Sequence, residues 1–184
     1  LLDERQLRVK NHSLHGTVHF DSAATAEALA AYPLPAYFLD FETIQFAVPI
    51  WKGTRPYQQI PFQFSLHVLD ESCELNHTPF LDISGKDPSE DFAQALLAAC
   101  GHHGPIFVYN AGFETARIRE LADRFPLISD DLLAINDRVV DLLPLAREHY
   151  YHPSQEGSWS IKKVLPAVVP ELRYDALDGV QDGG

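Results

Sequence analysis

The sequence predicts an α/β domain built on a mixed β-sheet. Three strand-like segments follow one another between residues 36 and 82, and segments with helical and strand patterns then alternate up to residue 170. Glycine, proline and short polar residues separate these segments where helices and strands usually end. Consecutive strands favour antiparallel pairing, whereas alternating helices and strands favour parallel pairing. We therefore expect three antiparallel strands followed by α/β alternation, with helices on both faces of the sheet.

Composition is consistent with one globular domain and a reducing cytoplasm. The 184 residues are 46% hydrophobic and 22% charged, no apolar run has the length of a membrane span, and nothing resembles a signal peptide. The two cysteines, Cys73 and Cys100, form no disulfide framework or metal-ligand pattern, and Cys100 is expected in the core. The net charge of −12 argues against a broad basic surface for nucleic acid. It does not exclude an enzyme that contacts phosphate through metal ions.

The two ends of the chain carry few structural signals. Residues 1 to 20 are polar without a clear period, so we expect an irregular linker or arm from a preceding domain. The chain starts at Leu1, contains no methionine and ends in "DGVQDGG". We therefore expect a piece of a longer protein, fused to another domain on its N-terminal side, with a domain over residues 21 to 184 that is truncated at its C-terminus.

The first elements have clear boundaries. Asp21 or Ser22 is a typical N-cap for an alanine-rich helix, which the following prolines end. "AYFLDFETIQFAVPI" then begins with an apolar run that predicts a strand covered on both faces. A long loop follows over residues 43 to 61. "FQFSLHVLD" alternates as a half-buried strand does, and "ELNHTPFLD" is expected to pair back with it as a hairpin.

The second half alternates helices with strands. Asp87 is a candidate cap, Pro88 fits a first helical position and Gly101 a helix end. "GPIFVYN" predicts a buried strand and "FETARIRELADRF" an amphipathic helix. The remaining segments are a helical turn in "DLLAIN", a strand leading into a helix in "RVVDLLPLAREHYY", and a helix that begins at Ser160.

Asp40 and Glu42 raise the question of function. Side chains alternate along a strand, so these two carboxylates should point to the same face. Burying two like charges together is costly unless a cation lies between them, and hard divalent cations prefer oxygen ligands. Carboxylates from other elements would complete a two-ion site for phosphoryl chemistry. The alternative is that Asp40 only ends the strand, while Glu42 caps a turn or pairs with an arginine.

Two further segments place acids where strands meet helices. "VYNAGFETARIREL" follows an apolar strand with Asn110 and then Glu114 at the start of a helix, and "VVDLLPLAREHY" places Asp141 at a strand end. With "FLDFET" and "SIKKVLP", these segments resemble the DEDD (DnaQ-like) 3′–5′ exonuclease superfamily of the ribonuclease H-like fold. The resemblance covers about residues 36 to 170. The stretch that begins "YFLDFETIQFAVPIWKGTRPYQQI" looks more closely like an uncharacterised bacterial family of unknown function within that group.

The resemblance implies a metal-dependent exonuclease that hydrolyses the phosphodiester bonds of DNA or RNA with two Mg²⁺ or Mn²⁺ ions. Asp40 would bridge both ions, Glu42 would bind the ion that activates water, and Glu114 would complete the shell of the second ion. Asp141 would be a helper acid, although capping of the next helix is an equal interpretation.

The same resemblance suggests residues for substrate binding. Asn110 and Phe113 would shape the pocket beside the ions, with a core position the simpler interpretation of Phe113. Lys52 and Arg55 would follow the phosphate backbone from the long loop, or that loop is simply solvated. Lys162 is a further candidate for phosphate, with a solvent-facing position as the alternative.

Two features depart from the family pattern. The second motif normally ends in Asp, where this chain has Glu114, and the third motif (Y-x-x-x-D or H-x-x-x-x-D) is absent, because Tyr174 and Asp175 lack its spacing. These departures keep two alternatives open. One is a catalytically impaired module that binds nucleic acid or a protein partner. The other is endonucleolytic cleavage on the same fold.

Overall fold

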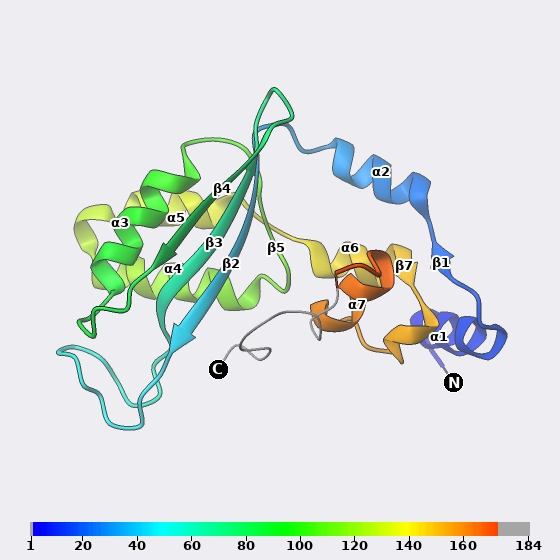
Figure 1. Cartoon of the computed structure of the whole chain (residues 1–184), viewed down its shortest axis with the longest axis horizontal. Coiled ribbons are helices and arrows are strands. Elements are labelled where there is room, and N and C mark those ends of the chain that lie inside the picture. The colour runs from blue at the N-terminus through cyan, green and yellow to red at the C-terminus, as the bar shows by residue number, and fades with distance from the viewer. Residues whose placement is uncertain (1, 173–184) are drawn as a thin grey trace. The chain divides into compact units, whose positions relative to one another are not determined.

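A computed structural model of the chain describes residues 2–172 (Figure 1). The chain divides into two compact units. We call Tyr32–Asp141 the central unit, and we call Leu1–Ala31 together with Leu142–Gly184 the flanking unit. No helix of residues 2–172 is both long and apolar enough to cross a membrane.

The central unit contains a five-stranded mixed sheet. The strand order is β4-β3-β2-β5-β6; β2, β3 and β4 pair antiparallel, whereas β5 pairs parallel with β2 and with β6. The mixed α/β class is therefore confirmed, as is the expected order of three antiparallel strands before α/β alternation. The strands are β2 (Ala36–Ile44), β3 (Ile60–Leu69), β4 (Leu75–Leu81), β5 (Ile106–Val108) and β6 (Val139–Asp141).

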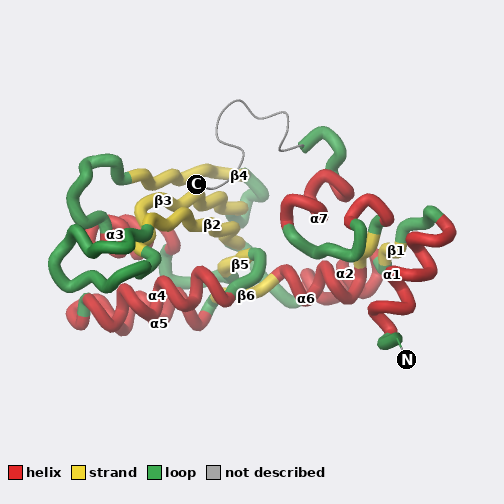
Figure 2. Tube along the Cα trace, turned by 90° about the horizontal axis from the view of Figure 1, so that it is seen from below, coloured by secondary structure: helices red, strands yellow, loops and turns green. Residues whose placement is uncertain are grey.

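Three α-helices cover one face of this sheet: α3 (Ser89–Cys100), α4 (Gly112–Arg124) and α5 (Ser129–Asp137), with a 3₁₀ turn η1 (Pro126–Ile128) between the last two. They lie together behind β2, β3 and β4 in Figure 1, and the view of Figure 2 agrees. The expected second layer of helices is not part of the central unit. We call the sheet face without these helices the open face of the unit.

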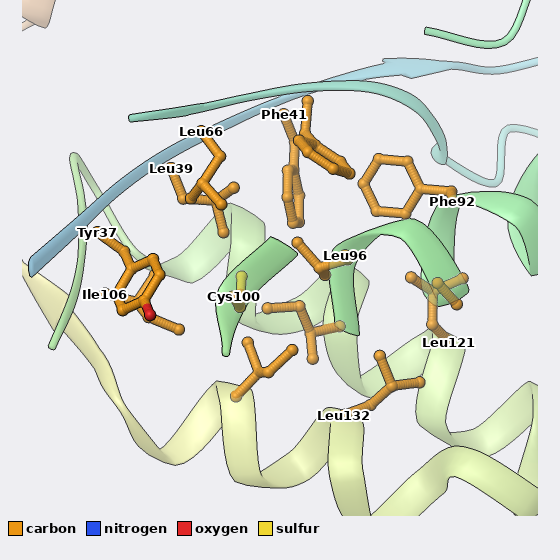
Figure 3. Close-up of a cluster of buried hydrophobic side chains, with 14 of the residues drawn as sticks. Tyr37, Leu39, Phe41, Leu66, Phe92, Leu96, Cys100, Ile106, Leu121 and Leu132 are labelled. Atoms are coloured by element: carbon orange, nitrogen blue, oxygen red, sulfur yellow. The ribbon is translucent and has the colours of Figure 1, made fainter. Parts of the chain in front are cut away.

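The core lies between the sheet and the three helices (Figure 3). Phe92 of α3 is fully buried and makes edge-on contacts with Phe41 and Phe64, at ring-centroid distances of 5.0 and 5.5 Å. Burial of such a side chain stabilises a fold by about 2–3 kcal/mol. Cys100 is fully buried, which confirms its core assignment, and burial raises the pKa of its thiol to about 12.

Strand β2 alternates between the two faces. Tyr37, Leu39 and Phe41 face the helices and are buried, whereas Phe38 remains 39% exposed and Asp40 is exposed. The expectation of a strand covered on both faces is therefore wrong. Its apolar run reflects one core face together with a single phenylalanine on the open face.

Two polar residues form a helix cap and a hairpin turn at positions that the sequence predicts. Asp21 caps α2 (Ser22–Ala30), since its Oδ1 accepts the N–H of Ala24 at 3.0 Å. Asp70 closes the β3–β4 hairpin by accepting the N–H groups of Ser72 and Glu74 at 2.8 and 2.9 Å. These contacts satisfy backbone donors that no regular element would satisfy.

The flanking unit corrects one expectation and confirms others. The expected irregular arm over residues 1 to 20 instead contains α1 (Glu4–His15), which begins with a capping box in which Asp3 and Gln6 bind each other's backbone N–H. This Asp-x-x-Gln signal was present in the sequence. The expected helices after Asp141 and after Ser160 are confirmed. The unit also contains β1 (His19–Phe20), which pairs antiparallel with β7 (Tyr150–Tyr151), and α6 (Leu142–His149), η2 (Pro153–Gln155) and α7 (Ile161–Val168).

The side chain of Arg138 binds the C-terminal end of α3 and the turn that follows it. Its guanidinium lies 5.2 Å from the ring centroid of Tyr37. Its N–H groups donate to four backbone carbonyls, those of Cys100, Gly101, His103 and Gly104, at 2.8–2.9 Å. The planar fork of an arginine makes this set of bonds possible, and a lysine ammonium cannot reproduce it.

We therefore expect Arg138→Lys to lower the free energy of unfolding by about 2–3 kcal/mol, because carbonyls at a helix end lose their donors. Urea unfolding at pH 7 measures the change. Arg119→Lys, at an exposed position on α4, is the control and should change stability by less than about 0.5 kcal/mol. An equal effect of the two variants would contradict the assignment.

Candidate active site

Asp40 and Glu42 lie on the open face of β2. Their antiparallel neighbours are Ser65 and Gln63 of β3, and a bulge follows Glu42. Asp40 is exposed and Glu42 is half-buried, while Phe41 between them faces the core. The two carboxylates therefore share a face, as the alternation of the strand predicts.

Glu114 is the third residue of α4 and is only 4% exposed. Strand β5 lies beside β2, so the turn after β5 brings the first turn of α4 to the end of the sheet where the acids lie. Asn110 makes this tight turn with φ 71°, a left-handed conformation that asparagine tolerates well. Within the part of the chain that the structure describes, Oε2 of Glu114 is buried and has no hydrogen-bond partner.

The buried position of Glu114 and its acidic neighbours change the pKa of its carboxyl. The pKa of its carboxyl is raised to about 7, chiefly by burial and to a smaller extent by the negative charges of Asp40 and Asp141, while a backbone hydrogen bond opposes the rise. Burial also raises the pKa of Asp40, although this residue lies at the surface, and a backbone hydrogen bond at Phe41 opposes the change. Three acids therefore share one region in which their charges repel one another, and a cation there would relieve the repulsion.

Asp141 is the last residue of β6. Its Oδ1 accepts the backbone N–H of Asn110 at 2.9 Å, which joins the ends of β5 and β6. Asp141 thus fixes the turn that positions Glu114 and also contributes to the negative field at that residue. Asp141 therefore has a structural role in this turn, in addition to any role as a metal ligand.

The expected set of metal ligands is not assembled in the structure. Among residues 2–172, no group of three or more histidine, cysteine, aspartate or glutamate side chains converges closely enough to hold a metal ion. Asp40 and Asp141 lie near enough to Glu114 to raise the pKa of its carboxyl, but the acids do not reach a ligand arrangement. The donor set still suits a hard divalent cation, because it consists of carboxylates and includes a buried oxygen of Glu114 that has no hydrogen-bond partner among residues 2–172.

Comparison with known proteins places this site inside a family. Residues 37–160 match the family described as Domain of unknown function (DUF2779). The chain belongs to the DUF2779 family. The matched range contains Asp40, Glu42, Glu114 and Asp141.

One curated relative is "Uncharacterized protein UU173" from Ureaplasma parvum serovar 3, which is 24% identical over 170 residues. The match covers 83% of this chain and 24% of the relative, so the chain spans about a quarter of the length of that protein. No solved structure matches the chain.

Two expected pocket residues of the DUF2779 segment have different environments. Phe113 is half-buried against the core, with the guanidinium of Arg117 5.7 Å from its ring centroid. Its core interpretation is confirmed. Asn110 is exposed and acts through its backbone, as the donor to Asp141.

The candidate basic residues are all exposed. Arg55 is 71% exposed and pairs with Glu120 of α4 at 3.7 Å, and Lys52 is exposed in the same loop. Lys162 is an exposed residue of α7 in the flanking unit. Tyr174 and Asp175 lie outside the described residues.

Arg117 is a residue that the sequence analysis missed. It lies one turn after Glu114, and its side chain is only 11% exposed. It donates to Glu120 at 3.0 Å and to Gln59 at the end of the long loop. This arginine therefore holds the loop that follows the first acidic motif against the helix that carries Glu114. The spacing Arg117-x-x-Glu120 was a sequence signal for the pair within α4, but no local pattern indicated the contact with Gln59.

Proposed function

We propose that this chain is a ribonuclease H-like, metal-dependent 3′–5′ exonuclease that hydrolyses phosphodiester bonds of nucleic acid. The strand order supports the proposal, because three antiparallel strands followed by two parallel strands on the side of the first is the arrangement expected of that fold. The D-x-E pair lies on the first of these strands, and a third acid begins the helix after the fourth.

The observation that carries the proposal is the buried carboxylate of Glu114. This acid is buried beside two acidic neighbours, and one of its oxygens has no hydrogen-bond partner within the described part of the chain, which is costly for a fold. Such a group is typical of functional sites, where a ligand compensates the cost. Here the ligand that compensates it is a divalent cation.

In this mechanism Asp40, Glu42 and Glu114 would hold two Mg²⁺ or Mn²⁺ ions. Ions in such a site lower the pKa of bound water and stabilise negative charge on the leaving oxygen. The chain itself contributes position and environment. Strand β2 fixes Asp40 and Glu42 on one face, the Asn110–Asp141 bond fixes the turn before Glu114, and burial keeps bulk water from the Glu114 carboxylate.

We expect the purified protein to shorten a 5′-labelled single strand stepwise from its 3′ end in Mn²⁺ or Mg²⁺. Asp40→Asn should lower the rate by about a thousandfold, since it removes a ligand that serves both ions. Asp123→Asn, an exposed acid on α4, is the matched control and should leave the rate unchanged. DNA and RNA strands are compared in parallel on a denaturing gel.

Two other results of this cleavage assay would indicate a different function. Cleavage of a circular strand would indicate an endonuclease. A folded protein that binds nucleic acid but does not cut it in either metal would indicate an impaired binding module. That second candidate is favoured by the absence, within residues 2–172, of three converging metal-ligating side chains.

A further inference from the structure

One face of α4 binds the loop of residues 45–59, which joins β2 to β3 and is drawn in cyan in Figure 1. Helix residues 117, 120 and 124 lie on one side of α4, because three and four positions separate them. Each of them contacts the loop: Arg117 donates to Oε1 of Gln59, Glu120 pairs with Arg55 at 3.7 Å, and Arg124 donates to the backbone carbonyl of Lys52 at 3.4 Å. The loop is therefore held along two turns of the helix.

Arg117 makes the most buried of these contacts. Its side chain is 11% exposed, against 31% for Glu120 and 71% for Arg55. Its guanidinium donates to Gln59 and, at 3.0 Å, to Glu120, and it lies over the ring of Phe113. The Nε atom of Arg117 is buried and has no hydrogen-bond partner among residues 2–172. A buried cation with an unmet donor contributes little net stability, so these contacts are better suited to fixing one arrangement of the loop.

The loop also connects two parts of the acidic site. It begins after Ile44, two residues beyond Glu42, and it ends at Gln59. The pairing of β2 with β3 is irregular directly after Glu42, so regular sheet bonds do not fix this end of β2. Arg117 lies one helical turn after Glu114. Its bond to Gln59 therefore closes a ring of chain that runs from Glu42 through the loop to the helix that carries Glu114.

We propose that Arg117 is a positioning residue of the ion site: by holding the loop on α4 it fixes Glu42 relative to Glu114, so that loop docking and ion binding favour each other. This inference rests on the proposed function and adds a means of regulating its site. Arg117 acts through the loop and the helix, and it does not itself bind the ion. Because such coupling is reciprocal, Mn²⁺ should hold the loop in its docked position, and a loop released from α4 should weaken the binding of Mn²⁺.

The first measurement is digestion of the loop by trypsin, which needs no nuclease activity. Trypsin cuts after lysine and arginine but not before proline. The loop therefore offers one bond, Lys52–Gly53, because Arg55 precedes Pro56. Cleavage of a native protein follows the population of its locally opened form. We expect Mn²⁺ to slow cleavage of this bond by about fivefold or more in the parent protein, and we expect Arg117→Ala to remove most of that protection.

The second measurement is the affinity for Mn²⁺ by titration calorimetry. Arg117→Ala should weaken it by about fivefold or more, and Gln59→Ala, which removes the loop partner alone, should do the same. The double variant should bind no more weakly than either single variant, because both changes remove one contact. In the cleavage assay at limiting Mn²⁺, Arg117→Ala should lower kcat and leave KM for the strand unchanged.

Two further variants separate positioning from loss of structure. Arg117→Lys supplies a point charge that can serve Gln59 or Glu120 but cannot reproduce the fork of an arginine, so its Mn²⁺ affinity should lie between those of the parent and Arg117→Ala. Arg119→Ala, at an exposed position on α4, is the matched control and should keep both the affinity and the protection of the loop. Gln59→Ala and Arg117→Lys remain informative if Arg117→Ala does not fold.

The positioning role would be refuted if Arg117→Ala were less stable but bound Mn²⁺ as tightly as the parent, since the arginine would then serve the fold alone. An equal loss of affinity in Arg119→Ala, or a parent protein that bound no Mn²⁺, would refute it as well. A protein that binds Mn²⁺ in the expected dependence on Arg117 but cuts no strand would refute the exonuclease and leave the positioning role in place. Normal cleavage with an Mn²⁺ affinity that does not depend on Arg117 would refute the positioning role alone.

Discussion

Replacing Glu114 with glutamine is expected to stabilise the protein in EDTA at pH 8 and to abolish its stabilisation by Mn²⁺. The carboxylate of Glu114 is buried, its Oε2 has no hydrogen-bond partner in the described part of the chain, and Asp40 and Asp141 add repulsion. A glutamine has nearly the same shape without the charge. It therefore removes the electrostatic cost while also removing a ligand for a cation.

The direction of the pH dependence follows from the pKa of Glu114. The pKa of its carboxyl is about 7 in the folded state, above its ordinary value of 4.5, so the folded protein binds this proton more tightly than the unfolded chain. The folded state is therefore favoured below pH 4.5, and this contribution is lost as the pH rises through 7. The full loss amounts to at most about 3 kcal/mol.

Urea unfolding at pH 5, 6, 7 and 8 measures this slope in the parent protein and in Glu114→Gln. The parent should lose stability over this range relative to the variant, which should be more stable at pH 8 by about 2–3 kcal/mol. Glu90→Gln, an exposed glutamate in the first turn of α3, is the control and should follow the parent. A variant that was less stable than the parent at pH 8 would mean that the carboxylate has a favourable partner in the fold.

Mn²⁺ should reverse the order of stability of the parent protein and the Glu114→Gln variant. A cation that binds only the folded state raises the free energy of unfolding by RT ln(1 + [L]/Kd), where [L] is its free concentration and Kd its dissociation constant. The thermal midpoint of the parent should therefore rise with Mn²⁺, more at pH 8 than at pH 5, where protons compete for the same oxygens. Glu114→Gln should show little of this rise. An equal rise in both proteins would place the ion elsewhere.

Local sequence patterns were sufficient to predict much of the secondary structure of the central unit. The alternation in "FQFSLHVLD" predicted β3, and the hairpin to β4 followed from the polar turn between them. The shared face of Asp40 and Glu42 followed from the period of a strand alone. Each of these features depends on residues that are close in sequence, which is why a sequence pattern contains them.

Features that depend on distant contacts were not predictable in the same way. The run Tyr37-Phe38-Leu39 did not reveal that only one face of β2 meets helices, because covered and open strands can both begin with three apolar residues. The bonds of Arg138 to the end of α3 join residues 34 to 38 positions apart. The proximity of Glu114 to Asp40 likewise depends on the pairing of β5 with β2.

That pairing depends on a glycine. Gly104 lies just before β5 with φ +89°, and a Cβ at this position would lie 2.0 Å from the carbonyl oxygen of Pro35, just before β2. Immediately beside this contact, the N–H of Tyr37 donates to the carbonyl of Pro105 at 3.0 Å. The obstacle is backbone on both sides, so it cannot rotate away as a flexible side chain would.

We therefore expect Gly104→Ala to destabilise the protein by about 4 kcal/mol or more, through the steric overlap and through a conformation that alanine rarely adopts. Urea unfolding measures the loss, and Gly112→Ala is the matched control. Gly112 is the first residue of α4, has no positive φ, and has no atom within 4 Å of a built Cβ. Alanine there should leave stability unchanged or raise it by about 0.5–1 kcal/mol.

The same pair of variants also tests how the site is positioned. If close contact between Gly104 and Pro35 sets the pairing of β5 with β2, any folded Gly104→Ala protein should lose its stabilisation by Mn²⁺, because Glu114 no longer lies near Asp40. Gly112→Ala, although two residues from Glu114, should keep it. Retention of the Mn²⁺ effect in Gly104→Ala, despite a large loss of stability, would show that Glu114 and Asp40 are held together by the core beneath them rather than by this crossing of the two backbones.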